Sequence, residues 1–263
     1  MDFRILAIGD IVGRPGRDAL KRRLKDLKAE ESVDFCVANG ENTAAGSGIT
    51  PDITEELLAA GVDVITTGDH VFRKKDIVPA MDRYQRLLRP ANYSAGAAGH
   101  GMCVVESARG VKVAVINVQG RIFMDPALCP FEFAEKLARE AAPQTCVIVV
   151  DAHCEATSEK IALGWFLDGR VSMVFGTHTH IQTADERVLP KGTAYITDLG
   201  MTGPYDSVLG RRIDRVLYSF TTQMPSHFEV ATDDVRISGA IATIDTATGR
   251  ASAIKRVHVA VPP

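Results

Sequence analysis

Residues 171–180 read Val171-Ser172-Met173-Val174-Phe175-Gly176-Thr177-His178-Thr179-His180. The apolar run Val171–Phe175 predicts a buried strand, and Gly176 predicts that the strand breaks there into a loop. Neutral imidazole is the commonest metal ligand among side chains. The two histidines are therefore either ordinary polar residues of a turn or ligands that point at one metal ion or at a neighbouring pair. The residues that end the other strands decide between these readings.

The N-terminal part of the chain alternates apolar runs with amphipathic ones. Between the apolar runs, leucines and alanines recur at helical spacing up to Leu27, and Thr50-Pro51 supplies an N-cap and a first-turn proline for a second helix. The order β-α-β-α-β implies parallel strands with right-handed crossovers. The three predicted strands are Phe3–Ile8, Phe35–Ala38 and Val62–Thr66.

The rest of the chain adds a hairpin, two helices and a β-rich C-terminal part. Apolar alternation on either side of Ala108-Arg109-Gly110 predicts an antiparallel hairpin of Met102–Glu106 and Val111–Val118. No repeat, low-complexity tract or linker interrupts the pattern, so we expect one domain, residues 1–263. The remaining predicted elements are helices Pro130–Ala141 and Thr157–Leu167 and strands Cys146–Val150, Ala194–Thr197, Val216–Thr222, Phe228–Ala231, Val235–Ile244 and Ala251–Val259.

Composition places the chain among ordinary globular proteins. It has 263 residues, 46% of them hydrophobic and 24% charged, and a net charge of -3 that gives no general attraction to nucleic acid or anionic membranes. The five cysteines form no C-x-x-C pair, which predicts reduced thiols. The N-terminal run is too short and too charged for a signal peptide, and no segment reaches the roughly 18 apolar residues of a membrane helix. We therefore expect a cytoplasmic protein.

Potential metal ligands follow five predicted strands. Any one of them has a structural explanation, such as an Asp that caps the next helix. In parallel α/β sheets, however, the carboxyl ends of the strands meet at one edge, where binding sites gather. Five successive coincidences favour a shared metal site. The residues are Asp10; Glu41 with Asn42; Asp69 with His70; His153; and His178 with His180.

The number and kind of these ligands indicate which metals would bind. Three carboxylates, one amide and three imidazoles are too many for one ion and suit two ions roughly 3.5–4 Å apart, with Glu41 as the candidate bridge. Mixed nitrogen and oxygen donors without thiolate favour Mn, Fe, Co, Ni or Zn over Ca or Mg. We interpret Cys154 as a neighbour of His153 and not as a ligand.

In this order, these residues resemble the calcineurin-like metallophosphoesterases. The narrower similarity is to their bacterial YmdB-like branch. It rests on the opening residues 9–17 (Gly-Asp-Ile-Val-Gly-Arg-Pro-Gly-Arg), on Asn39-Gly40-Glu41-Asn42 and on residues 194–204 (Ala-Tyr-Ile-Thr-Asp-Leu-Gly-Met-Thr-Gly-Pro). The resemblance covers nearly the whole chain.

The resemblance implies a four-layer α/β/β/α sandwich with a dinuclear metal site. It also implies that His70 stands beside the site without binding metal. Because His70 follows Asp69 directly, it is our candidate to donate a proton to the leaving group; the alternative is a residue that only forms hydrogen bonds there. Carried over residue by residue, the ligands of one ion would be Asp10, Glu41, Asn42 and His180, and those of the other Glu41, Asp69, His153 and His178.

Two positions depart from the pattern of the family. The broad superfamily usually begins with D-x-H, whereas Val12 stands here in place of the histidine, two positions after Asp10. The YmdB-like branch also lacks this histidine, and Asn42 compensates for the missing ligand. Asp69 stands where the family usually has Asn. A third carboxylate should tighten metal binding and lower the positive charge that attracts a phosphate.

The resemblance implies a phosphodiesterase that hydrolyses cyclic nucleotides, 2′,3′-cyclic ahead of 3′,5′-cyclic, through attack by a hydroxide that bridges the two ions. Fe or Mn is expected first, with Zn, Ni or Co as alternatives. Thr202, in the Gly-Met-Thr-Gly loop, is a candidate to line the substrate pocket. Assembly of the chain into a homo-oligomer is compatible with this interpretation.

Three other functions compete with this interpretation. The same metals would serve a phosphomonoesterase or protein phosphatase, and a metal-stabilised regulatory or RNA-degradation-associated binding protein would turn substrate over only incidentally. A metal amidohydrolase would place H-x-H after the first strand, whereas here the motif comes late.

Overall fold

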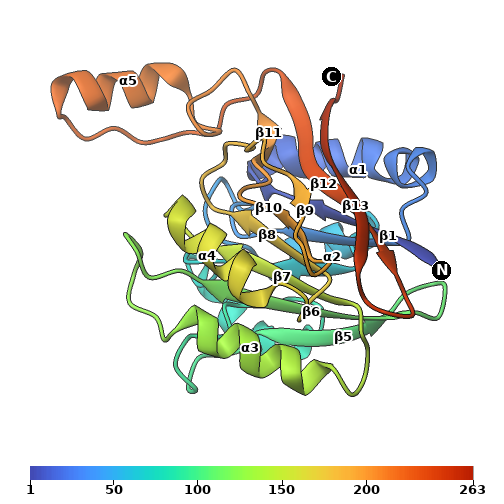
Figure 1. Cartoon of the computed structure of the whole chain (residues 1–263). Helices are drawn as coiled ribbons and strands as arrows, with labels where there is room; N and C mark the ends of the chain where they lie inside the picture. Colours follow the sequence, from blue (N-terminus) through green and yellow to red (C-terminus); the bar gives the residue numbers. More distant parts are fainter. Residues whose placement is uncertain (263) are drawn as a thin grey trace.

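The computed structural model describes residues 1–262, in which two β-sheets pack face to face between helices (Figure 1). In the seven-stranded sheet the order is β2-β11-β12-β1-β3-β4, with β13 paired to β12. Strands β1, β3 and β4 are parallel, as the β-α-β-α-β order predicts. The bounds are β1 Asp2–Ile8, β2 Asp10–Ile11, α1 Gly13–Glu30, β3 Phe35–Asn39, α2 Pro51–Ala59, β4 Val64–Thr66, β11 Met201–Pro204, β12 Val235–Asp245 and β13 Ala251–Ala260.

The six-stranded sheet has the order β5-β6-β7-β8-β10-β9. Its first two strands form the predicted antiparallel hairpin, and β6, β7, β8 and β10 are parallel. The bounds are the 3₁₀ helix η1 Lys75–Arg83, β5 Met102–Glu106, β6 Lys112–Gln119, α3 Pro130–Ala141, β7 Ile148–His153, α4 Thr157–Leu167, β8 Met173–Thr177, β9 Arg187–Val188 and β10 Ala194–Ile196.

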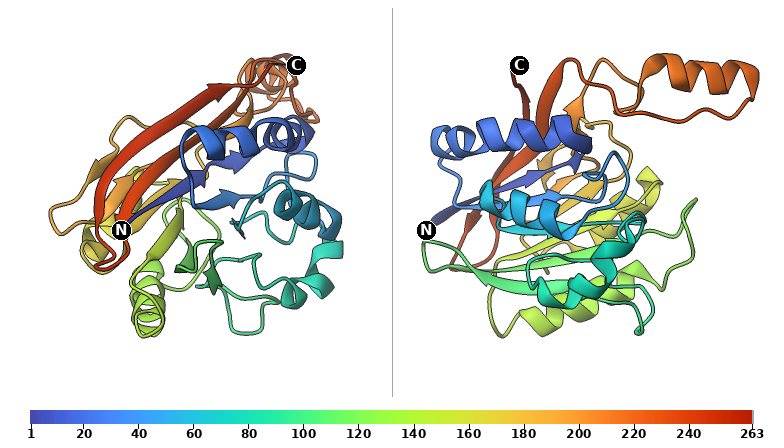
Figure 2. Two further views of the ribbon diagram at one scale, coloured as in Figure 1. Left: turned by 90° about the vertical axis from the view of Figure 1, so that its right-hand side faces the viewer. Right: turned by 180° about the vertical axis from the view of Figure 1, so that it is seen from behind.

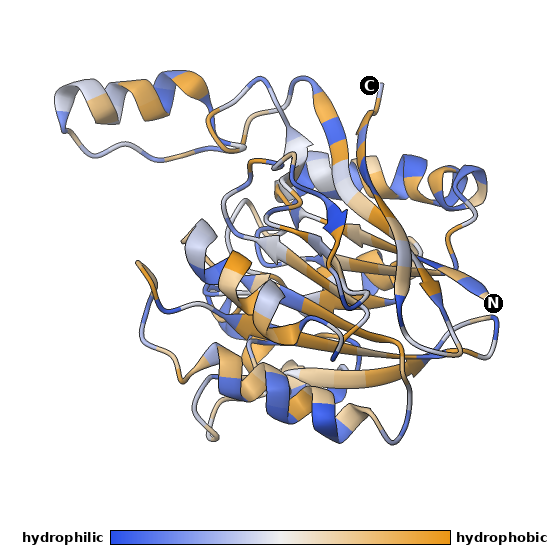
Figure 3. Ribbon diagram, viewed as in Figure 1, coloured by the Kyte–Doolittle hydropathy of each residue, from blue (hydrophilic) through white to orange (hydrophobic). Residues whose placement is uncertain are grey.

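Three separate hydrophobic cores define four layers. Along β1, Leu6 and Ile8 pack beneath α1 and α2, whereas Phe3 and Ile5 face the other sheet, because successive side chains of a strand point to opposite faces. A third core lies between the six-stranded sheet and α3 and α4. The fold is therefore the expected α/β/β/α sandwich, with helices on both outer faces (Figure 2) and apolar residues concentrated on the strands (Figure 3).

Local helix signals predicted several boundaries correctly. Helices α3 and α4 have the predicted bounds. Thr50 caps α2 as expected, because its hydroxyl accepts the backbone N–H of Ile53 at 3.4 Å and Pro51 opens the helix. None of the helices in residues 1–262 combines the length and the apolar run that crossing a bilayer requires.

The predicted strand Val216–Thr222 is wrong. These residues belong to helix α5, Ile213–Thr222, which projects from the body of the molecule (Figure 1). Branched and aromatic residues suggested a strand, but Ile213, Leu217 and Phe220 recur at helical spacing. The predicted strand Phe228–Ala231 is also wrong, since it forms only an isolated bridge between Val230 and Arg211.

Strands β7 and β8 run further than predicted. Strand β7 continues through Asp151 to His153, and β8 continues to Thr177. The polar side chain of Asp151 suggested that the strand had ended, yet it is completely buried and hydrogen-bonded. A buried carboxylate with partners is compatible with a strand interior, so His153 is held by the sheet and not by a loop.

Candidate metal centre

Four predicted ligands converge where the two sheets end together. The acids Glu41 and Asp69 follow β3 and β4 of one sheet, and His153 and His178 lie at the ends of β7 and β8 of the other. One ligand atom from each lies within 4.8 Å of the other three. The Nε2 atom of His153 is 3.2 Å from Oε1 of Glu41 and 3.1 Å from Oδ1 of Asp69. Imidazole and carboxylate groups so arranged form a mixed nitrogen and oxygen donor set.

The other three predicted ligands lie beside this group. The Nδ2 atom of Asn42 is 3.2 Å from Oε1 of Glu41 and 3.2 Å from Nε2 of His180. That Nε2 atom lies 3.9 Å from Oδ1 of Asp10. Glu41 thus lies between the first four ligands and the other three, as a bridging carboxylate would.

Asp10 tests whether these residues fit a cation. Its side chain is completely buried, and Oδ2 accepts the backbone N–H of His178 at 3.0 Å. The other oxygen, Oδ1, is buried without any hydrogen-bond partner. Burial raises the pKa of Asp10. Because an unpartnered buried oxygen is costly, this atom fits a metal ion among the neighbouring donors.

The charges within the group compensate one another. Burial alone would raise the pKa of Asp69, but hydrogen bonds with His153 and His178 hold it well below its usual range. Burial would lower the pKa of His153, but Glu41 and Asp69 raise it well above its usual range. The two carboxylates therefore stay ionised and hold positive charge on His153, charge that a divalent cation would replace.

The loop with the two histidines is held in an uncommon backbone conformation. His178 and His180 have φ angles of 98° and 64°, a region that L residues seldom adopt. Between them, the backbone N–H of Thr179 donates to Oδ2 of Asp198 at 3.2 Å. The same oxygen accepts a 2.6 Å bond from Nζ of Lys160 on α4, and both side chains are buried. The buried ion pair fixes the loop that presents the ligands.

His70 lies at the edge of the group. Its Nδ1 atom is 2.8 Å from Oδ1 of Asn42, and its backbone N–H donates to Oε2 of Glu41 at 3.1 Å. Its side chain is 29% exposed, and Nε2 is 3.5 Å from Oδ2 of Asp69. An amide oxygen can only accept, so Nδ1 carries a proton and Nε2 is the nitrogen available to a substrate.

Gly68 gives the backbone room beside the ligands. A β-carbon at this position would overlap the ring of His153 and Oε2 of Glu41. The glycine therefore permits the chain to pass close to both side chains.

Sequence reasoning missed Glu155, and its assignment of Thr202 needs correction. Oε2 of Glu155 is 3.2 Å from Nε2 of His178, on the side of the ring away from His153. The only indication in the sequence was that Glu155 stands two residues after His153. Thr202 lies in β11, completely buried, and its hydroxyl bonds to the backbone of Ser238. That hydroxyl is not free to contact a substrate, so we do not place Thr202 in the pocket.

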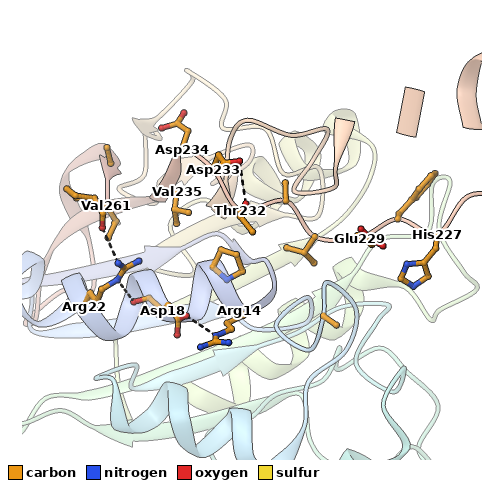
Figure 4. A pocket seen from close by; sticks show the side chains of 17 residues that line it. Arg14, Asp18, Arg22, His227, Glu229, Thr232, Asp233, Asp234, Val235 and Val261 are labelled. Carbon is orange, nitrogen blue, oxygen red and sulfur yellow. Dashed lines mark hydrogen bonds and ion pairs between the residues drawn. The ribbon is translucent and has the colours of Figure 1, made fainter. Parts of the chain in front are cut away.

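A separate cavity of about 900 Å³ lies between α1 and residues 227–235 (Figure 4). Arg14, Asp18 and Arg22 line it from α1, and Val235 of β12 and Val261, the residue after β13, also line it. None of the seven predicted metal ligands lines this cavity. We therefore place the candidate site at the converging ligands and not in this cavity.

Comparison with known proteins identifies the family of the chain. A family model described as "YmdB-like protein" matches residues 6–257. The chain belongs to the YmdB-like protein family. The resemblance noted from the strand-end residues is thereby confirmed.

Similar proteins span almost the whole of this YmdB-like chain. The 2′,3′-cyclic-nucleotide 2′-phosphodiesterase of Bacillus subtilis (strain 168) is 49% identical over 257 residues, 98% of this chain and 97% of that protein. A putative phosphatase/phosphodiesterase of Mycoplasma pneumoniae is 33% identical and covers 98% of this chain and 93% of its own length.

Two solved structures share the fold. A hypothetical protein from Thermus thermophilus has a TM-score of 0.92 and 38% identity, covering 99% of this chain and 100% of that one. A structure described as a novel phosphatase from Mycoplasma pneumoniae has a TM-score of 0.91 and 33% identity, covering 99% and 94%.

Proposed function

We propose that this protein is a metal-dependent phosphodiesterase that hydrolyses cyclic nucleotides, 2′,3′-cyclic in preference to 3′,5′-cyclic. The observation that carries the proposal is the convergence of Glu41, Asp69, His153 and His178 at the edge shared by the two sheets. The Bacillus subtilis relative, named as a 2′,3′-cyclic-nucleotide 2′-phosphodiesterase, supports the substrate class.

The ligand groups support two divalent ions. Divalent ions at such a site supply Lewis acidity and acidify water. Fe or Mn fits the oxygen and nitrogen donors, with Zn, Ni or Co as alternatives. The second ion would be held by Glu41, Asp69, His153 and His178. The first would be held by Asp10, Glu41 and His180, with Asn42 contributing its amide oxygen, the atom that also lies 2.8 Å from Nδ1 of His70.

His70 is the proposed proton donor. As an imidazolium, it keeps Nδ1–H on the Asn42 oxygen and presents Nε2–H outward. Transfer of the Nε2 proton to the leaving oxygen avoids expulsion of an unstable alkoxide, an effect of about 10²–10⁴-fold. The bond to Asn42 and the backbone bond to Glu41 hold the ring beside the ligands.

Three broader properties belong to the same proposal. One family model spans residues 6–257, which supports treating residues 1–263 as a single domain. The five free thiols suit the reducing cytoplasm. The proposed partner is a small cyclic nucleotide.

Metal analysis of the purified protein, paired with turnover of 2′,3′-cyclic AMP, tests the proposal. We expect about two transition-metal ions per chain in the wild type and loss of turnover in Glu41→Gln, with an unchanged circular dichroism spectrum. Full activity after exhaustive chelation would refute the proposal.

The names of the Mycoplasma relatives favour one alternative, a phosphomonoesterase with the same site. A panel of nucleoside monophosphates and cyclic diesters separates the two activities. Higher kcat/KM on the monoesters would favour the alternative.

A further inference from the structure

A buried carboxylate lies directly behind the candidate metal centre. Asp151 is completely buried, and on β7 it shares a face with His153, two residues further on. It accepts hydrogen bonds from side chains at the ends of three other strands. These donors are Asn39 Nδ2 at 3.2 Å, the hydroxyl of Thr66, and the hydroxyl of Thr177 at 2.7 Å.

Thr177 connects Asp151 to a predicted metal ligand. Its hydroxyl has one proton, which it donates to Oδ1 of Asp151. The hydroxyl oxygen of Thr177 also lies 2.8 Å from Nδ1 of His153. Because the hydroxyl proton is donated to Asp151, this oxygen can only accept a hydrogen bond from Nδ1. Nδ1 of His153 must therefore carry a proton. The lone pair of the neutral ring is then on Nε2, the nitrogen that faces Glu41 and Asp69.

Asn39 is the one competing neighbour of Nδ1. Its Oδ1 atom accepts the backbone N–H of Glu41 at 3.1 Å, which turns Nδ2 toward Asp151. From there Nδ2 is 3.5 Å from Nδ1 of His153, well beyond the 2.8 Å of the threonine hydroxyl. The shorter contact sets the proton on the ring.

We propose that Asp151 is a positioning residue which, through the hydroxyl of Thr177, fixes His153 in the tautomer that leaves Nε2 free for the metal ion. The inference rests on the proposed metal site. Outer partners of metal-binding histidines set the tautomer and orientation of the ring, and losing them costs about 10–100-fold in metal affinity. The carboxylate suits this role because, unlike a hydroxyl or an amide, it has no proton to return to Thr177.

The test uses full-length protein loaded with diamagnetic Zn²⁺ and labelled with ¹⁵N at histidine. In the wild type, NMR should show a protonated Nδ1 and a proton-free Nε2 on His153. Thr177→Val keeps the shape but removes the hydroxyl, so the hydrogen-bonded Nδ1 proton should exchange faster and the dissociation constant for Zn²⁺, measured against a chromophoric chelator, should rise by about 10–100-fold. Thr177→Ser should restore both.

Asp151→Asn is the sharper variant. The new amide can donate to Thr177, which frees the hydroxyl proton to point at Nδ1 and favours the opposite tautomer of His153. Metal affinity should fall at least as far as in Thr177→Val. Thr193→Val is the matched control, because Thr193 is an equally buried, doubly bonded threonine just before the start of β10. It should change neither the His153 signals nor the affinity for Zn²⁺.

Two results would overturn the inference. One is an NMR spectrum of the wild-type protein in which His153 carries its proton on Nε2 and none on Nδ1; this measurement requires no variant. The other is a zinc affinity within twofold of wild type in both Thr177→Val and Asp151→Asn. Failure of the metal-site proposal would look different, since the wild type itself would then not bind Zn²⁺ at His153.

Discussion

The Nε2 atom of His153 lies 3.2 Å from Oε1 of Glu41, although the two residues belong to different sheets. The centre therefore spans the interface between the two halves of the sandwich. Of the candidate ligands, Asp10, Glu41, Asn42 and Asp69 come from the seven-stranded sheet, and the three histidines come from the six-stranded one.

Removal of metal should destabilise the fold as well as stop turnover. An ion that binds only the folded chain stabilises it by about 2.7 kcal/mol at one hundred times its Kd. For a chain of this size, that corresponds to a shift of roughly 5–10 °C in Tm. Differential scanning calorimetry with and without a chelator measures the shift, and re-addition of metal should reverse it. An identical Tm under both conditions would contradict the prediction.

Asp69→Asn should retain activity and weaken metal retention. The amide keeps an oxygen beside His153 and His178 but loses the negative charge. Removing one ligand charge should raise the metal dissociation constant, which a chelator competition assay measures. An inactive variant that still holds its full complement of metal would refute this.

His70→Gln should slow turnover without loss of metal. We expect kcat to fall by about 10²–10⁴-fold for cyclic nucleotides, whose leaving group needs a proton. A diester with a nitrophenol leaving group should be affected far less, because nitrophenolate leaves unprotonated. Comparable losses on both substrates would point to a positioning role for His70.

Gly68→Ala should disrupt the centre, because its β-carbon would overlap the ring of His153 and the carboxylate of Glu41. Metal content and activity should both fall sharply. Gly96→Ala is the control, since a β-carbon there meets nothing within 4 Å. Normal metal content in Gly68→Ala would show that the backbone moves to make room.

Lys160→Met should destabilise the protein strongly. It leaves Asp198 buried without its partner, and breaking a buried ion pair costs about 3–5 kcal/mol. Urea denaturation measures the loss. The double variant Lys160→Met/Asp198→Asn should recover part of it, and strictly additive losses would argue against coupling between the two residues.

Much of the fold could be predicted because the signals are local. Nearly continuous apolar runs located β1, β3 and β4, and the helical spacing and cap residues located α2, α3 and α4. The position of β12 between β1 and β11 could not be predicted, since it depends on pairing between segments far apart in the sequence. Helix α5 was missed because its branched and aromatic composition favours a strand, although its apolar residues recur at helical spacing.

The convergence of the candidate ligands could be predicted because they share one recognisable position, the end of a strand. The residues that hold them could not. Asp198 reveals its role only through its contact with the backbone of Thr179, and Lys160 only through its ion pair with Asp198. Thr177 reads in sequence as a plain turn residue. Their identities are chemically ordinary, and only the three-dimensional arrangement makes them partners of the site.

Because each half of the sandwich carries only part of the ligand set, neither half is competent alone. A nascent or proteolytically nicked chain whose sheets have not yet docked has scattered acids and imidazoles in place of a centre. We therefore expect hydrolytic capacity only after the two sheets have docked, because only then do the acids and imidazoles of the candidate centre lie together.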